Sequence, residues 1–191
     1  MNYCYALLCC LLLHWPATAQ QRVWQAYPID QQLTVRFPAP PQQLDVSATM
    51  AANNSPSRDS LRVQTSQAFR VEDATANYIL VSIPLLTAQP HIGTTSEREA
   101  YYKSRGIPLM VAQLHGELLE QTVSTTPELD SFTVKLRTLT VDGSSGVKYV
   151  RVLTTNTRIY QLYFIPKDKT GEIGTAQRTQ FFDASILVRG K

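Results

Sequence analysis

The sequence predicts an α+β domain in which helices pack on one face of an antiparallel β-sheet. Polar and apolar residues alternate over most of the chain, which is typical of strands with one buried face. Two stretches, at residues 94–122 and 175–183, interrupt this alternation and carry helix signals. Because no internal repeat or low-complexity linker divides the chain, residues 20–191 are expected to form one domain around a single sheet.

The first strands follow from the alternation. Residues 33–37 place three apolar side chains on one face of a strand, and prolines end it because proline has no N–H to donate to a neighbouring strand. Residues 44–48 and 61–72 alternate in the same way, with a turn cluster between them. Residues 77–83 are apolar on both faces, which indicates a central strand.

A helix is expected just after residue 94. Ser96-Glu97-Arg98-Glu99 reads as a capping box, with Ser96 as the N-cap and Glu99 bonding back to its N–H. Lys103 lies one turn from Glu99 and is spaced to pair with it. Gly106 is expected to end this short helix.

A second helix is expected to follow at once. Pro108 suits a first helical turn. Val111, Leu114 and Leu118 then recur at helical spacing, so the helix is expected to run to about residue 122.

Strands return over residues 131–141. Phe132 and Leu139 fall on opposite parity, and a bulge near Thr138 would reconcile them. Beyond the next two strands, Thr175 can cap a last helix that runs to about Asp183. A short strand over residues 186–188 closes the domain.

The two strands over residues 147–155 and 158–165 are expected to form a hairpin with Asn156-Thr157 as a two-residue loop. That register makes three predicted cross-strand pairs: Leu153 with Tyr160 and Tyr149 with Phe164 on one face, and Val150 with Tyr163 on the other. Both faces of the hairpin are then largely apolar, although Arg151 interrupts the first.

Such a hairpin needs other parts of the structure, a partner or a ligand to cover both of its apolar faces. Helices can cover one, and the N-terminal residues Val23, Trp24 and Tyr27, a partner, or a ligand in a cleft must cover the other. Ordinary core coverage is the favoured interpretation. If a ligand or partner takes that place, its predicted contact residues are Tyr149, Tyr160 and Tyr163.

Residues 1–19 read as a signal peptide. An apolar run at residues 6–13 is followed by Pro16 and by Ala17-Thr18-Ala19, the small-x-small pattern that signal peptidase accepts, so cleavage is expected before Gln20. The run is too short to span a bilayer, which needs about 20 apolar residues. The expected location is therefore periplasmic or secreted, with no integral membrane span after processing.

The three cysteines, Cys4, Cys9 and Cys10, all lie in the segment to be removed, so the processed chain is expected to hold no disulfide and no thiolate metal site. The net charge of +3 is small and its basic residues are scattered among apolar ones, so a nucleic-acid partner is not expected.

No catalytic, cofactor-binding or metal-ligating residue and no cofactor is predicted, because no phosphate loop, dinucleotide fingerprint, zinc-protease motif or nucleophile elbow occurs in the sequence. His91 reads as a solvated loop histidine. His115 reads as an ordinary helical histidine, because the nearby carboxylates are two and five positions away and share no helical face with it. Two pairs of carboxylates read as solvated loop charges: Glu128 with Asp130, and Asp168 with Glu172.

Three segments resemble proteins related to PsbP, the extrinsic photosystem II subunit. They are the opening strand at residues 33–40, the strand Tyr160-Gln161-Leu162-Tyr163, and the closing helix and strand at residues 178–188. The resemblance implies an antiparallel sheet flanked by helices. It also implies a binding or assembly role, since no single activity characterises that family.

The expected function is therefore that of an exported, non-catalytic binding or assembly protein of the cell envelope with a protein partner there. One alternative is a small-molecule carrier with an apolar cleft near the three tyrosines. The other is an uncharacterised hydrolase, which would require titratable side chains gathered in one concavity.

Overall fold

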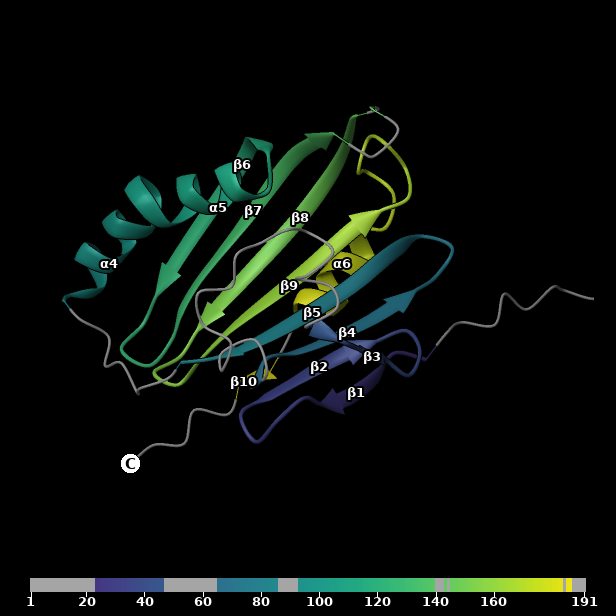
Figure 1. Ribbon diagram of the computed structural model, residues 1–191, viewed down its shortest axis with the longest axis horizontal. Helices are drawn as coiled ribbons and strands as arrows, with labels where there is room; N and C mark the ends of the chain where they lie inside the picture. The colour runs from purple at the N-terminus through teal and green to yellow at the C-terminus, as the bar shows by residue number, and fades with distance from the viewer. Residues whose placement is uncertain are drawn as a thin grey trace, which may run out of the picture.

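The computed structural model describes residues 23–46, 65–85, 93–139, 143, 145–183 and 185–186. They form a curved seven-stranded sheet, a small three-stranded sheet beside it, and two helical segments (Figure 1). All strand neighbours in both sheets are antiparallel, so the predicted α+β class is confirmed. The expected single sheet is in fact two.

The spatial order of the large sheet departs from the chain order only once, where β5 pairs with β9. Its strands, in spatial order, are β3 (Gln42–Leu44), β4 (Gln67–Glu72), β5 (Ala76–Pro84), β9 (Arg158–Pro166), β8 (Ser145–Thr154), β7 (Asp130–Leu139) and β6 (Gly116–Thr125). In the small sheet β2 (Leu33–Phe37) lies between β1 (Gln25–Pro28) and β10 (Ser185–Ile186).

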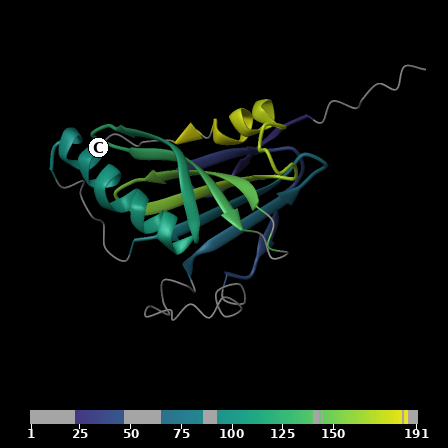
Figure 2. The same ribbon diagram turned by 90° about the horizontal axis from the view of Figure 1, so that it is seen from above.

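The helices lie on both faces of the large sheet, so the prediction that they share one face is wrong. The long segment made of α4 (Thr95–Tyr101), η1 (Tyr102–Gly106) and α5 (Ile107–Gln113) packs on one face. Helix α6 (Thr175–Phe182) packs on the other together with β2 (Figure 2). Strand β8 shows the reason. Its neighbours Tyr149 and Val150 point to opposite faces, and both faces are apolar, so both need cover.

The β8–β9 hairpin has the predicted register. Leu153 lies opposite Tyr160, Tyr149 opposite Phe164, and Val150 opposite Tyr163. The turn closes with a 2.9 Å hydrogen bond from the Thr155 N–H to the Arg158 carbonyl.

Residues 95–113 form one continuous helical segment. It comprises α4 (Thr95–Tyr101), the π-helical turn η1 (Tyr102–Gly106) and α5 (Ile107–Gln113), so Gly106 does not end a helix. Pro108 does stand in the first turn of α5, and the predicted Lys103–Glu99 pair is present at 2.6 Å.

The N-cap is Thr94, not Ser96. Its hydroxyl accepts from the Glu97 N–H at 3.2 Å, and the Glu97 carboxylate accepts from the Thr94 N–H at 2.7 Å. The Thr94 hydroxyl also donates to the Glu97 carboxylate, at 3.0 Å. The bonds that this carboxylate accepts from the Thr94 N–H and hydroxyl hold the pKa of Glu97 below its usual value.

The second predicted helix ends sooner than expected. Strand β6 begins at Gly116, so Leu118 lies in a strand, and His115 is an exposed turn residue with a positive φ of 49°. The predicted bulge near Thr138 is also wrong, because the pairing of β7 with β8 is unbroken. The register shift lies instead on β6, between Leu118 and Glu120, and Leu139 is simply exposed.

The N-terminal segment covers part of the core, as ordinary core coverage predicts. The Trp24 ring meets Tyr78 edge-on with centroids 5.5 Å apart, and Tyr27 lies 6.0 Å from Phe37, while Val23 is exposed. Several predictions fall outside the described residues: the signal peptide at 1–19, the turn at 53–57, His91, and the strand residues 61–64, 140–141 and 187–188.

Candidate functional site

The three predicted contact tyrosines do not come together. Tyr149 and Tyr160 belong to the core beneath β2 and α6, where they are 8% and 0% exposed. Tyr163 lies on the opposite face of the sheet and is half-buried. Two of the three are therefore core residues, and only Tyr163 borders a surface.

Tyr160 ends in a polar cluster at one end of the sheet. Its hydroxyl donates to Asp30 Oδ2 at 2.8 Å, and Arg158 Nε lies 3.5 Å from the same oxygen. Arg158 Nη1 also donates to the buried Ser82 hydroxyl at 2.8 Å. Burial, together with the bond to Asp30, raises the pKa of Tyr160. These contacts fasten the loop after β1 to the β8–β9 hairpin.

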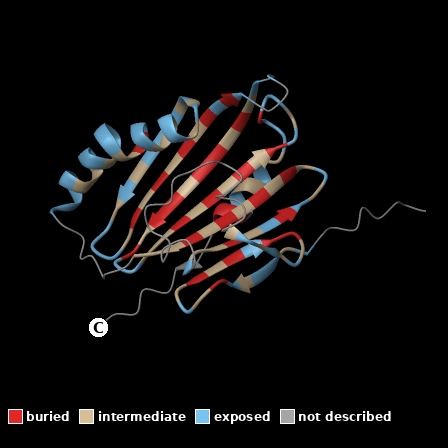
Figure 3. Ribbon diagram, in the orientation of Figure 1, coloured by how far each residue is buried: buried red, intermediate tan, exposed pale blue. Residues whose placement is uncertain are grey.

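The surface that borders Tyr163 is apolar. Its members point to the same face of β5 and β9 and are all half-buried; we call them the β5–β9 apolar surface: Ile79, Val81, Ile83, Ile159, Tyr163 and Ile165. Figure 3 shows the alternation of buried and half-buried residues along both strands. Register places Ile79 opposite Tyr163 and Ile83 opposite Ile159, so the six side chains adjoin one another.

Polar atoms within this surface have partners. The Tyr163 hydroxyl donates to Gln161 Oε1 at 2.7 Å, and burial raises the pKa of Tyr163 to about 12. At one end, Arg70, Glu72 and Lys167 form a charged rim, with Glu72 2.6 Å from Arg70 and 2.9 Å from Lys167. An apolar centre inside a polar rim is the usual anatomy of a protein-binding patch.

The helical layer lies beside this surface. Ile107 of α5 is fully buried in an apolar cluster that it forms with residues of β7 and β8. Ile159 and Tyr163 pack against this cluster and also belong to the β5–β9 apolar surface. Among the described elements, α4–η1–α5 is the segment packed on this face, and it covers the end near β6.

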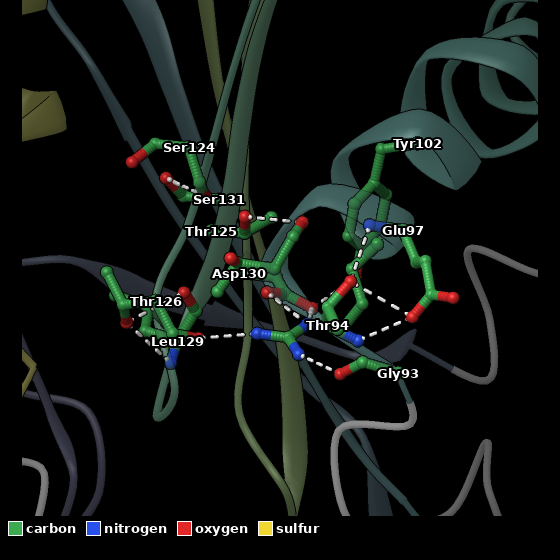
Figure 4. Close-up of polar contacts among 12 residues, drawn as sticks. Gly93, Thr94, Glu97, Tyr102, Ser124, Thr125, Thr126, Leu129, Asp130 and Ser131 are labelled. Atoms are coloured by element: carbon green, nitrogen blue, oxygen red, sulfur yellow. Dashed lines mark hydrogen bonds and ion pairs between the residues drawn. The ribbon is translucent and has the colours of Figure 1, made fainter.

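A buried ion pair holds the helical layer in place (Figure 4). Asp130, expected as a solvated loop charge, is only 2% exposed and starts β7. It accepts from Arg98 Nε at 3.0 Å and from the Tyr102 hydroxyl at 3.2 Å. Arg98 also donates to the carbonyls of Gly93 at 2.8 Å and Thr126 at 2.7 Å. Burial is the main reason that the pKa of Tyr102 rises to about 12.

The described residues contain no group of three or more histidine, cysteine or carboxylate side chains that could hold a metal ion. Within the same residues, no helix is long and apolar enough to cross a membrane.

Sequence reasoning found part of the β5–β9 apolar surface, because residues 77–83 were recognised as apolar on both faces. It missed Arg98 and Asp130, whose partnership joins residues 32 positions apart. No local pattern could have signalled that contact.

The fold and this surface define an antiparallel α+β protein in which, among the described residues, α4–η1–α5 covers the end of one sheet face near β6. No protein-family model matches the chain, and no curated protein matches it either.

Proposed function

We propose that this chain is a non-catalytic binding or assembly protein of the cell envelope, and that the β5–β9 apolar surface is where it binds. The observation that carries the proposal is six adjoining half-buried apolar side chains on the face that α5 covers only at its other end. The signal-peptide pattern at residues 1–19 and the resemblance to PsbP-related proteins support export and an assembly role.

The occupant proposed for this surface is the apolar side of an amphipathic helix from another envelope protein. A helix placed there would lie beside α5 and extend the cluster around Ile107 across Tyr163. The charged rim of Arg70, Glu72 and Lys167 suits the polar flank of such a helix. Because the Tyr163 hydroxyl already donates to Gln161 Oε1, an apolar occupant would not deprive that hydroxyl of its hydrogen-bond acceptor.

A small-molecule carrier is the second candidate, because the same apolar side chains could line a ligand site. For a hydrolase, one group of titratable side chains among the described residues is the cluster of Asp30, Arg158 and Tyr160. Its contacts are accounted for by fastening a loop, so no specific observation favours hydrolysis.

Site-specific photo-cross-linking in envelope preparations tests the proposal. A photoreactive residue at Val81 should give one discrete protein adduct, and the added substitution Ile83→Lys should remove it. The same photoreactive residue at Thr122, exposed on β6, is the matched control and should give no such adduct. Thermal denaturation verifies that each variant is folded.

Adducts of equal yield at Val81 and Thr122, or none at Val81, would contradict the proposal. Native mass spectrometry supplies the other arm. A bound apolar small molecule that Ile83→Lys displaces, without a protein adduct, would replace the assembly role with the carrier role.

A further inference from the structure

We propose a second binding site, for a phosphate group, on the opposite face of the large sheet beside α6. It consists of Lys135, Arg151 and Arg178 with the hydroxyl of Thr133, and we call it the α6 cation cluster. It shares no residue with the β5–β9 apolar surface, so the two proposals stand or fall separately.

Strand pairing places four side chains of this region in a compact square. Lys135 lies directly opposite Tyr149, and Thr133 lies directly opposite Arg151. Opposite residues have Cβ atoms about 5 Å apart, and next-but-one residues on a strand are about 7 Å apart on the same face. Lys135, Thr133 and Arg151 therefore share one face of the sheet with Tyr149 and are its neighbours there.

Arg178 enters this square from α6. Its guanidinium carbon lies 3.9 Å from the centre of the Tyr149 ring, and Lys135 Nζ lies 5.8 Å from the same centre. The Tyr149 hydroxyl is fixed by a 2.9 Å bond to the Gly171 carbonyl, so the ring is a rigid platform. Stacking orients the Arg178 guanidinium, and no carboxylate of the described residues pairs with it, so its N–H edge is left for an external anion.

Arg151 is the second half-buried guanidinium without a carboxylate bonded to it in the described part of the chain. Its Nη1 donates to the Phe182 carbonyl at the end of α6, which fixes the side chain and leaves other N–H groups unused. Asp183 acts on Arg151 only at longer range and lies 3.9 Å from Arg36 instead. Burial lowers the pKa of Arg151, as expected for a cation that is partly desolvated without a direct counter-ion.

Lys135 is the third cation of the α6 cation cluster. It pairs at 3.1 Å with Glu120, whose carboxylate is 70% exposed, so an incoming anion can compete for it. Three cations and a hydroxyl, offset by two largely exposed carboxylates, match a doubly charged phosphate better than a single carboxylate. Guanidinium groups bind phosphate oxygens through paired hydrogen bonds.

Inorganic phosphate is the probe for this site. Titration of the folded protein, followed by NMR of backbone amides at constant ionic strength, should give saturable shifts at Thr133, Arg151 and Arg178. Arg178→Gln and Lys135→Gln should each weaken binding by at least about tenfold, as expected for a charge-assisted hydrogen bond. Arg137→Gln is the matched control, because it removes the same charge two residues from Lys135 but from an exposed pair with Glu117. It should change affinity by less than about twofold.

Three results would overturn the site: no saturable binding, equal weakening in the Arg137→Gln control, or shifts that map elsewhere. Vesicles of phosphatidylglycerol separate the sources of phosphate. If the protein sediments with these vesicles but does not bind inorganic phosphate, the site is also overturned. It is proposed for a doubly charged phosphate, and the phosphate diester of a lipid headgroup carries only one charge. Circular dichroism confirms the fold of each variant, and Arg151→Gln is avoided because its bond to Phe182 supports α6.

Discussion

The guanidinium of Arg98 donates from Nε to both carboxylate oxygens of Asp130, at 3.0 and 3.2 Å, with the two side chains 11% and 2% exposed. The pair joins the last turn of α4 to the first residue of β7. It fastens α4 to β7 on the same sheet face that carries the β5–β9 apolar surface.

Replacing one member of this pair should be costly, because it leaves the other charge buried and unpaired. Asp130→Asn is expected to lower the free energy of unfolding by about 3–5 kcal/mol, measured by urea denaturation. The control is Glu120→Gln, which breaks an exposed pair with Lys135 and should cost less than about 1 kcal/mol.

The double variant Arg98→Met/Asp130→Leu separates the loss of the ion pair from the cost of leaving one buried charge without its partner. It should recover part of the loss, because no unpaired charge remains. A loss for Asp130→Asn no larger than that of the control would show that the pair is not a buried anchor.

The elements that sequence could predict are those whose pattern is local. The β8–β9 register followed from the parity of Leu153 and Tyr160 around a two-residue turn, and it is confirmed. Strand β6 was missed because its bulge between Leu118 and Glu120 breaks the alternation, while Leu114 and Leu118 mimic a helical repeat. Gly106 was misread because a π-helical turn carries the helix through it.

Features that depend on contacts between residues far apart along the chain could not be predicted from the sequence. Both apolar faces of β8 were predicted, but nothing local says that α6 covers one and α5 the other. Asp130 follows a proline-containing turn and resembles a solvated loop charge until Arg98 is placed beside it. Arg178 likewise gained its role only when α6 packed above Tyr149.

The cap of α4 gives a second prediction. Thr94→Ala removes the hydroxyl that accepts from the Glu97 N–H and should cost about 1 kcal/mol in thermal or urea unfolding. Ser96→Ala, an exposed change inside the same turn, is the control and should cost almost nothing. Equal costs for the two variants would mean that Thr94 contributes no more than Ser96 to capping α4.

Two half-buried tyrosines give a third prediction, on alkaline stability. The pKa values of Tyr102 and Tyr163 are raised to about 12 by burial, above the unfolded value of 10.0. A raised pKa means that the folded state holds the proton more tightly, so this stability is full below pH 10 and is lost as the pH rises to about 12. Circular dichroism and tyrosinate absorbance should report unfolding and ionisation together in that window.

Tyr163→Phe keeps the ring and removes the ionisable hydroxyl, so its stability should fall less steeply over the same window. Tyr101→Phe, at a side chain 54% exposed, is the matched control and should follow the parent protein. Identical slopes for all three proteins would mean that Tyr163 does not titrate with unfolding.

The loop before α6 gives the last prediction. Gly174 has a φ of +89°, and a Cβ there would stand 2.6 Å from Thr75 Cγ2 and 2.9 Å from Phe164 Cζ. Gly174→Ala therefore combines a left-handed backbone cost of about 1–2 kcal/mol with overpacking of about 1–3 kcal/mol. Gly143→Ala shares the positive φ, at +76°, but its Cβ would meet nothing within 4 Å, so only the backbone cost applies. Urea denaturation should give Gly174→Ala a clearly lower free energy of unfolding than Gly143→Ala.

Because α6 carries Arg178, Gly174→Ala should also weaken the stacking of Arg178 on Tyr149, visible as a change in tyrosine near-ultraviolet dichroism. Equal stability of the two variants would mean that the start of α6 is not pressed against Phe164.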